Sequence, residues 1–161
     1  MTAQSISPTI ERLRKGHIEA PCVERNVVRR AYRVLTVPEQ LAKRGQISPE
    51  QLQACAKLER HYLGSLGVDV GDDDTRHNDE AVVDYAQSYH AQKVAEARKV
   101  LTSNEFQAQM LMIQTSFTVE DIGRRLAGWE CRKMCKGYGL SVIHSSSDRL
   151  IKLWGMQAHP G

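Results

Sequence analysis

Apolar residues along this chain recur mostly at steps of three and four, the spacing that places them on one face of an α-helix. The alternation of apolar and polar residues that marks a half-buried β-strand is almost absent. The sequence therefore predicts an all-α fold, a helical bundle with short connections.

The N-terminal part is predicted to contain a basic amphipathic helix over residues 23–35. Its apolar positions are mainly valines at helical spacing. Its opposite face carries four arginines, which form a second candidate basic surface: Arg25, Arg29, Arg30 and Arg33. Pro38 cannot continue this helix, because proline lacks the backbone N–H and clashes with the preceding turn. We therefore expect a short second helix from Pro38 to Gly45.

Capping residues mark the start of the next helix. Ser48 is suited to the N-cap, Pro49 to the first helical position and Gln51 to the third position of a capping box. The helix is expected to reach about Gly64 or Gly67. Its predicted buried stripe consists of Leu52, Cys55, Leu58, Tyr62 and Leu66.

A linker is predicted in the middle of the chain. Residues 67–78, GVDVGDDDTRHN, combine two glycines with three consecutive aspartates and show no periodicity. The expected organisation is an N-terminal basic helical region (1–70), an acidic linker (71–78) and a C-terminal helical region (79–161). The aspartates lack the turn glycine and the twelfth-position acid of a calcium loop, so no metal site is predicted there.

The C-terminal region is predicted to open with a long helix from Asp79 to Leu101, whose apolar stripe could support a homodimer. Ser103 or Asn104 is then expected to cap a helix over residues 105–114. One further helix is expected to begin near residues 145–148, with Trp154 buried at its end.

Residues 105–154 carry the pattern of a helix-turn-helix. Thr118 is suited to the N-cap of a short helix that ends at Gly128, and a second helix follows from Trp129 or Glu130. Gly123 falls where the two helices are expected to cross. The residues of the second helix expected to point inward are Cys131, Met134, Cys135 and Tyr138.

The charge pattern adds a candidate function to this motif. The chain has 22 Lys and Arg residues against 19 Asp and Glu residues, a net charge of +3, which is too small to indicate a nucleic-acid partner by itself. Between residues 123 and 138, however, Glu130 is the one acidic residue against five basic ones. These candidate DNA-binding residues are Arg124, Arg125, Arg132, Lys133 and Lys136. Such a density suits contact with phosphates and release of their counterions.

The sequence gives no sign of an enzyme. It lacks the GxxxxGK[ST], GxSxG and HExxH motifs, and its six histidines are dispersed. Cys131, Cys135 and His144 could be brought together, but the paired spacing of a zinc site is missing, so no metal and no cofactor are predicted. No apolar run could span a membrane and the N-terminus has no signal-peptide pattern, so we expect a cytoplasmic protein with reduced thiols.

Two stretches resemble known regulators. The run QTSFTVEDIGRRLAGWECRKMCKGYGLSVIHSSSDRLIKLWG resembles the helix-turn-helix of sigma-factor region four and of phage-type regulators. The run AYRVLTVPEQLAKRGQISPEQLQACAKLERHYLGSLG is similar to the region that precedes this module in regulators of prophages and gene transfer agents. The resemblance implies that the five basic residues named above face DNA, with Glu130 and Ser141 as further candidates.

The leading hypothesis is an activator-type transcription regulator of phage or phage-derived genes, which reads promoter DNA and contacts RNA polymerase. Three alternatives stay open at this point. They are an antitermination factor that travels with RNA polymerase, a phage small terminase subunit, and an interaction protein that does not bind DNA. Double-stranded DNA is thus the expected partner, and no membrane partner is expected.

Overall fold

The computed structural model describes residues 18–19, 23–24, 27–28, 33–68, 80–114 and 117–156. These residues form an all-α fold, as the periodicity predicts. The helices are α2 (Val37–Lys43), α3 (Pro49–Ser65), α4 (Glu80–Val100), α5 (Ser103–Ile113), α6 (Val119–Ala127) and α7 (Arg132–Leu153). Four strands of two residues each precede them: β1 (Ile18–Glu19), β2 (Val23–Glu24), β3 (Val27–Val28) and β4 (Arg33–Val34).

The predicted helix over residues 23–35 is wrong. Instead, β2 pairs with β3 and β1 pairs with β4, both antiparallel. Val23 lies opposite Val28, and Ile18 lies opposite Val34. β-branched side chains lose rotamer freedom in a helix and pack well on a pleated surface, so a stretch whose apolar positions are mainly valines favours extended pairing.

Side-chain capping sets the start of four helices. In each case a Ser or Thr at the N-cap accepts from the third residue of the helix, whose own side chain accepts from the N-cap backbone. The predicted caps at Ser48 and Thr118 are confirmed. The cap of α5 is Thr102 rather than Ser103 or Asn104, because Glu105 supplies the reciprocal bond.

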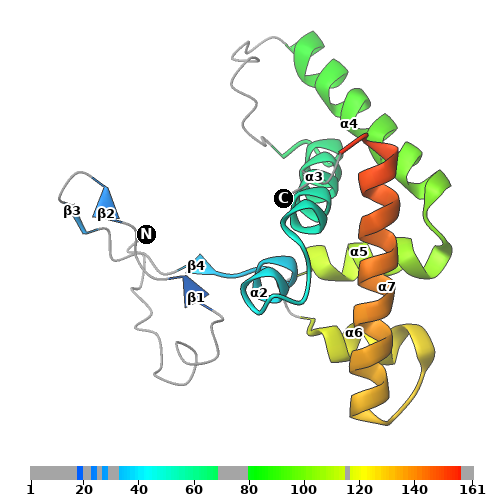
Figure 1. Cartoon of the computed structure of the whole chain (residues 1–161). Coiled ribbons are helices and arrows are strands. Elements are labelled where there is room, and N and C mark those ends of the chain that lie inside the picture. Colours follow the sequence, from blue (N-terminus) through cyan, green and yellow to red (C-terminus); the bar gives the residue numbers. More distant parts are fainter. Residues whose placement is uncertain are drawn as a thin grey trace.

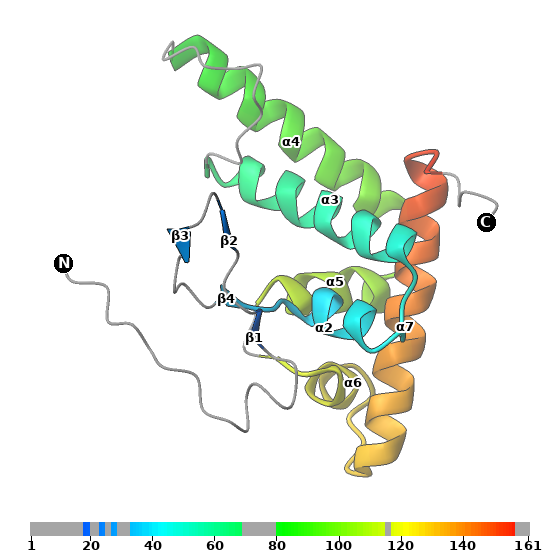
Figure 2. The same cartoon turned by 60° about the vertical axis from the view of Figure 1, so that its left-hand side comes forward.

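The helices are arranged along α7. Figure 1 and Figure 2 show α3 and α4 side by side near the C-terminal end of α7, α5 across its middle, and α6 beside its N-terminal half. With 22 residues, α7 is about 33 Å long, so it passes every layer of the bundle.

Two clusters of buried apolar residues form the core. The larger includes Leu41 and Cys55 together with Met112, Ile122 and Ile143, and so joins α2, α3, α5, α6 and α7. The smaller joins α3 and α4 to the last turns of α7: Ala54, Leu58, Ala97, Leu101 and Leu150. Residues of the predicted N-terminal region (1–70) and of the C-terminal region (79–161) thus share both clusters. The predicted linker, residues 71–78, lies outside the described residues.

The predicted stripe of α3 holds in its middle and fails at its end. Cys55 and Leu58 are buried, whereas Leu66, at the C-cap, is 59% exposed. Trp154 follows the last turn of α7 and packs against the smaller cluster, half-buried.

The expected extra helix at residues 145–148 is wrong, because α7 continues through them without a break. Ser146 and Ser147 are fully buried, and both hydroxyls donate to the Ile143 carbonyl oxygen, at 3.0 and 2.7 Å. Serine can satisfy its hydroxyl in this way inside a helix, so a run of serines need not be a cap.

Buried polar side chains tie α5 and α3 to α7. The Gln109 amide donates to the Ser146 hydroxyl at 2.7 Å, and the Cys55 sulfur lies 3.2 Å from the Ser147 hydroxyl. Burial raises the pKa of the Cys55 thiol, which keeps it protonated. The amide nitrogen of Gln51, the third residue of α3, also donates to Asp148 at 2.9 Å.

A pair of buried histidines lies between α3 and α4. Their Nδ1 atoms, on His61 and His90, are 3.0 Å apart, and the His61 ring also faces Trp154 at a centroid distance of 5.9 Å. Gly64 leaves the space that the His90 ring occupies, since a Cβ there would lie 2.6 Å from its Cγ. Burial is the main cause that lowers the pKa of His61 to about 4; the neighbouring His90 is the next largest cause, and the charges of Lys57, Lys93 and Arg60 add to it.

Candidate nucleic-acid interface

The connection between α6 and α7 is a turn of four residues, 128–131, at the place where the sequence predicts a helix-turn-helix. Gly128 ends α6 with a φ of 68°, in the left-handed region that glycine adopts without steric cost. Trp129 packs against Tyr138 with ring centroids 5.3 Å apart, and the Cys135 thiol donates to the Trp129 carbonyl oxygen at 3.1 Å. These contacts hold the turn against the beginning of α7.

The two helices cross with their backbones in contact. A Cβ on Gly123 would lie 2.6 Å from the Cys135 carbonyl carbon, and nearer still to its oxygen. A Cβ on Gly139 would lie 3.1 Å from the Gly123 nitrogen. The prediction that Gly123 lies at the crossing is confirmed. Gly139, inside α7, provides the other half of the crossing.

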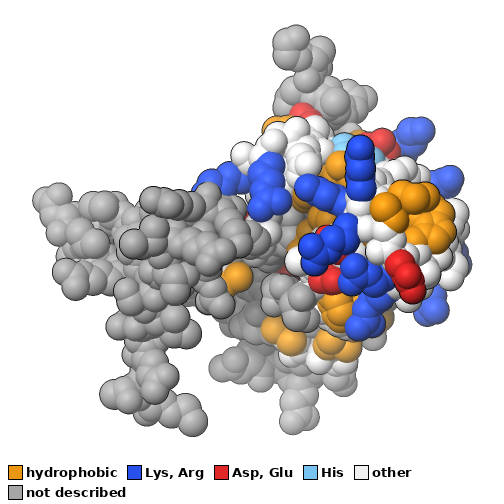
Figure 3. Space-filling model, turned by 90° about the horizontal axis from the view of Figure 1, so that it is seen from below, with side chains coloured by type: hydrophobic (Ala, Val, Ile, Leu, Met, Phe, Trp, Pro, Cys, Tyr) orange, Lys and Arg blue, Asp and Glu red, His pale blue; other side chains and the backbone are white. Residues whose placement is uncertain are grey.

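The five predicted basic residues all lie on the surface at this end of the molecule. We call them the α6–α7 basic surface: Arg124, Arg125, Arg132, Lys133 and Lys136. Each is exposed, and the Arg132 side chain is 85% exposed. Figure 3, which views the molecule from the α6 end, shows Lys and Arg side chains gathered on this face with few acidic ones among them.

An acidic residue outside the predicted window organises two of these arginines. Glu120 Oε1 lies 2.8 Å from a terminal nitrogen of Arg124 and 3.3 Å from Nε of Arg132. It therefore links α6 to the first residue of α7 and offsets part of the positive charge. Glu120 and Arg124 are four residues apart in the sequence, a spacing at which side chains on one helix can form an ion pair. The contact of Glu120 with Arg132 depends instead on how the helices cross.

The remaining side chains of the surface have different surroundings. The Arg125 guanidinium lies 4.2 Å from the centre of the Phe117 ring, a cation–π geometry that also orients it. Among the described residues, Lys133 and Lys136 form no ion pair, so their charges are available to an external anion.

Asp121 caps the helix, and its other carboxylate oxygen lies 3.8 Å from a terminal nitrogen of Arg124. Its carboxylate accepts from the Thr118 backbone N–H at 3.0 Å and from the Thr118 hydroxyl at 2.8 Å. These hydrogen bonds, with the nearby charges of Arg124 and Arg125, hold the pKa of Asp121 below its usual value. The carboxylate is thus committed to capping α6.

Two of the four residues predicted to point inward from α7 do not. Cys135 is buried and Tyr138 is half-buried, but Cys131 is exposed and Met134 is 53% exposed. The helix begins at Arg132 rather than at Trp129 or Glu130, so Cys131 precedes it as the N-cap residue, and the buried face of α7 runs through Cys135, Gly139 and Val142. In the described part of the chain, no three His, Cys, Asp or Glu side chains form a possible metal site.

Three of the four arginines of the second candidate basic surface are not among the described residues. Arg25, Arg29 and Arg30 lie outside the described residues, and Arg33 is part of β4 rather than of a helix. The structure adds a basic residue that the sequence reasoning did not select. Arg44, at the C-cap of α2, lines a cleft together with Lys136, although the two are far apart in the sequence.

Comparison of the chain with protein-family models, with curated proteins and with solved structures finds no match. Within the described residues, no helix combines the length and apolarity needed to cross a membrane.

Proposed function

We propose that the chain is a DNA-binding transcription regulator that contacts promoter or operator DNA with the α6–α7 basic surface. The observation that carries this proposal is the position of five exposed cationic side chains on two consecutive helices at one end of the bundle. In helix-turn-helix proteins the first residues of the second helix enter the major groove, while the first helix crosses the DNA backbone. Arg132, Lys133 and Lys136 occupy the first two turns of the second helix here.

The pairing of Arg132 with Glu120 suits this role. An arginine held at its side by a carboxylate keeps its terminal nitrogens free to form a forked pair of hydrogen bonds with a guanine or a phosphate. Lys133 and Lys136 would then supply phosphate contacts, which fix orientation without reading sequence.

The test is a titration of labelled duplex DNA from the region upstream of the gene, followed by fluorescence anisotropy over a range of salt concentrations. We expect affinity to fall steeply with salt, because each phosphate contact releases counterions. The variant Arg132→Gln, Lys133→Gln should reduce the slope of log K against log salt by up to about 1.8.

The matched control is Lys99→Gln, Lys152→Gln, which removes the same charge from exposed positions on α4 and on the last turn of α7. Lys152 is about 30 Å along α7 from Arg132, so its loss should change the slope little. Equal effects of the two double variants would contradict the proposed surface. Absence of DNA binding by the folded protein would contradict the proposed function.

Chromatin immunoprecipitation distinguishes the proposed regulator from the alternative functions. Sharp peaks that the Arg132→Gln, Lys133→Gln variant loses would support a regulator at promoters. Signal that spreads through transcribed genes would favour antitermination, and a ring-shaped oligomer in solution would favour a small terminase subunit. No enrichment would favour an interaction protein.

A further inference from the structure

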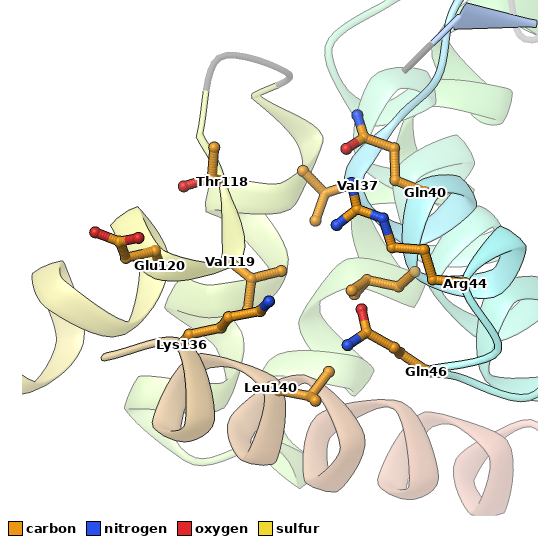
Figure 4. A pocket seen from close by; sticks show the side chains of 10 residues that line it. Val37, Gln40, Arg44, Gln46, Thr118, Val119, Glu120, Lys136 and Leu140 are labelled. Carbon is orange, nitrogen blue, oxygen red and sulfur yellow. The ribbon is translucent and has the colours of Figure 1, made fainter. Parts of the chain in front are cut away.

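A cleft of about 220 Å³ opens between α2, α6 and the N-terminal half of α7. Its walls come from segments distant in the sequence, with Gln40, Arg44 and Gln46 on one side and Val119 and Lys136 on the other. Figure 4 shows the Arg44 and Lys136 side chains extending toward the same space from opposite walls. The cleft directly adjoins the α6–α7 basic surface, because Lys136 belongs to both.

The chemistry of the lining favours an anion with an apolar body attached. Arg44 and Lys136 supply two positive charges, and the amide nitrogens of glutamine can donate further hydrogen bonds. The apolar residues of the lining are Val37, Leu41, Val119 and Leu140. A phosphate joined to a sugar has this combination of a charged head and C–H surface.

One carboxylate also lines the cleft and must be accounted for. Glu120 is engaged by Arg124 and Arg132, at 2.8 and 3.3 Å, so its charge is already balanced. In Figure 4 its carboxylate points away from Arg44. The Glu120 carboxylate is therefore not directed into the space between Arg44 and Lys136.

We propose that this cleft binds a phosphate group of a nucleotide between Arg44 and Lys136, and that the source is the backbone of the DNA that the α6–α7 basic surface contacts. The choice of DNA as the source rests on the proposed function. The phosphate chemistry of the cleft rests on its lining alone. A DNA phosphate bound in this cleft would make α2 part of the DNA interface. Neither the sequence of α2 nor its position along the chain indicates such a role.

The first test compares Arg44→Gln with Lys43→Gln in the DNA titration. Lys43 is the adjacent residue, carries the same charge and is exposed, but it does not line the cleft. Because a hydrogen bond to a charged group is lost, Arg44→Gln should weaken DNA binding about tenfold and reduce the salt slope by about 0.9. Lys43→Gln should change affinity no more than about twofold.

The second test needs no DNA. A ¹H–¹⁵N spectrum of the protein is titrated with inorganic phosphate and with deoxyadenosine monophosphate, and the amide signals of Gln46, Lys136 and Leu140 are followed. Saturable shifts that Arg44→Gln removes would support the phosphate site. If free deoxyadenosine monophosphate binds tightly, the phosphate that the cleft holds comes from a small molecule rather than from the DNA backbone.

The outcomes separate this proposal from the proposed function. If Arg132→Gln, Lys133→Gln abolishes DNA binding while Arg44→Gln and Lys43→Gln behave alike and phosphate shifts no cleft signal, the cleft proposal is overturned and the regulator stands. If the protein binds no DNA but phosphate shifts the cleft signals, the proposed function and the DNA source are overturned, and the phosphate site itself stands. Circular dichroism of Arg44→Gln confirms in each case that the variant is folded.

Discussion

The crossing of α6 and α7 allows a sharp test of the packing on which the candidate interface depends. The substitution Gly123→Ala adds a single methyl group at the point where the two backbones touch. The new Cβ would lie 2.6 Å from the Cys135 carbonyl carbon, whereas ordinary van der Waals contact begins near 3.4 Å. The obstacle is backbone, which cannot rotate away as the end of a side chain can.

The magnitude follows from this geometry. The helices must separate by at least about 0.8 Å to restore ordinary contact, and more to clear the carbonyl oxygen. Inserting a methyl group into a close-packed site costs about 1–3 kcal/mol and occasionally more. Separation also loosens the packing of the larger core cluster, in which Ile122 and Ile143 are fully buried. Alanine has a higher helix propensity than glycine, which offsets about 1 kcal/mol of this cost. Because the clash is with backbone, we place the cost at the upper end of this range and expect a net loss of about 2 kcal/mol in the free energy of unfolding.

The assay is urea denaturation followed by circular dichroism, with Gly137→Ala as the matched control. Gly137 lies on α7 two residues before Gly139, and a Cβ there would meet nothing within 4 Å. The control should therefore stabilise the protein by up to about 1 kcal/mol through helix propensity. A Gly123→Ala variant as stable as the wild type, or as stable as Gly137→Ala, would refute the close crossing.

Two further predictions concern the polar interior. His61, whose pKa is about 4 in the folded protein against 6.5 ordinarily, favours its neutral form there. Its contribution to stability is therefore complete above pH 6.5 and is lost as pH falls toward 4, up to about 3 kcal/mol. The free energy of unfolding, measured by urea denaturation at pH 7 and at pH 4.5, should differ less between the two pH values in His61→Leu than in the wild type. An unchanged difference would show that another group is responsible for the loss of stability at low pH. Ser146→Ala leaves the buried Gln109 amide without its 2.7 Å partner and should cost about 1–3 kcal/mol, whereas Ser141→Ala, at an exposed position of the same helix, should stay within about 0.5 kcal/mol. Similar thermal denaturation midpoints for the two serine variants would contradict this assignment.

Local signals in the sequence account for the parts of the fold that could be predicted. The caps at Ser48 and Thr118 depend on residues three apart, and the stop at Gly128 depends on one backbone conformation. Gly123 could be placed at the crossing because a turn with glycine between two short helices implies close packing. Each of these features is decided within a few residues.

The features that escaped prediction depend on which residues meet across the fold. Ser146 and Ser147 look like a cap until the helix is seen to bury them against Gln109 and Cys55. Arg44 joins the candidate site only because α2 packs near α7, and Glu120 reaches Arg132 only because of the crossing. The helix over residues 23–35 failed for a different reason, since valines at helical spacing are also good strand residues.

The path of α7 through both clusters of the core has a consequence for how the molecule comes apart. Ile143 belongs to the larger cluster and Leu150 to the smaller, and they are two turns apart on one unbroken helix. If the α7 residues of one cluster unfold, the helix that supplies residues to the other cluster is disrupted. The bundle is therefore expected to unfold as one cooperative unit, and the amide hydrogens of Ile143 and Leu150 should be protected from exchange to a similar degree.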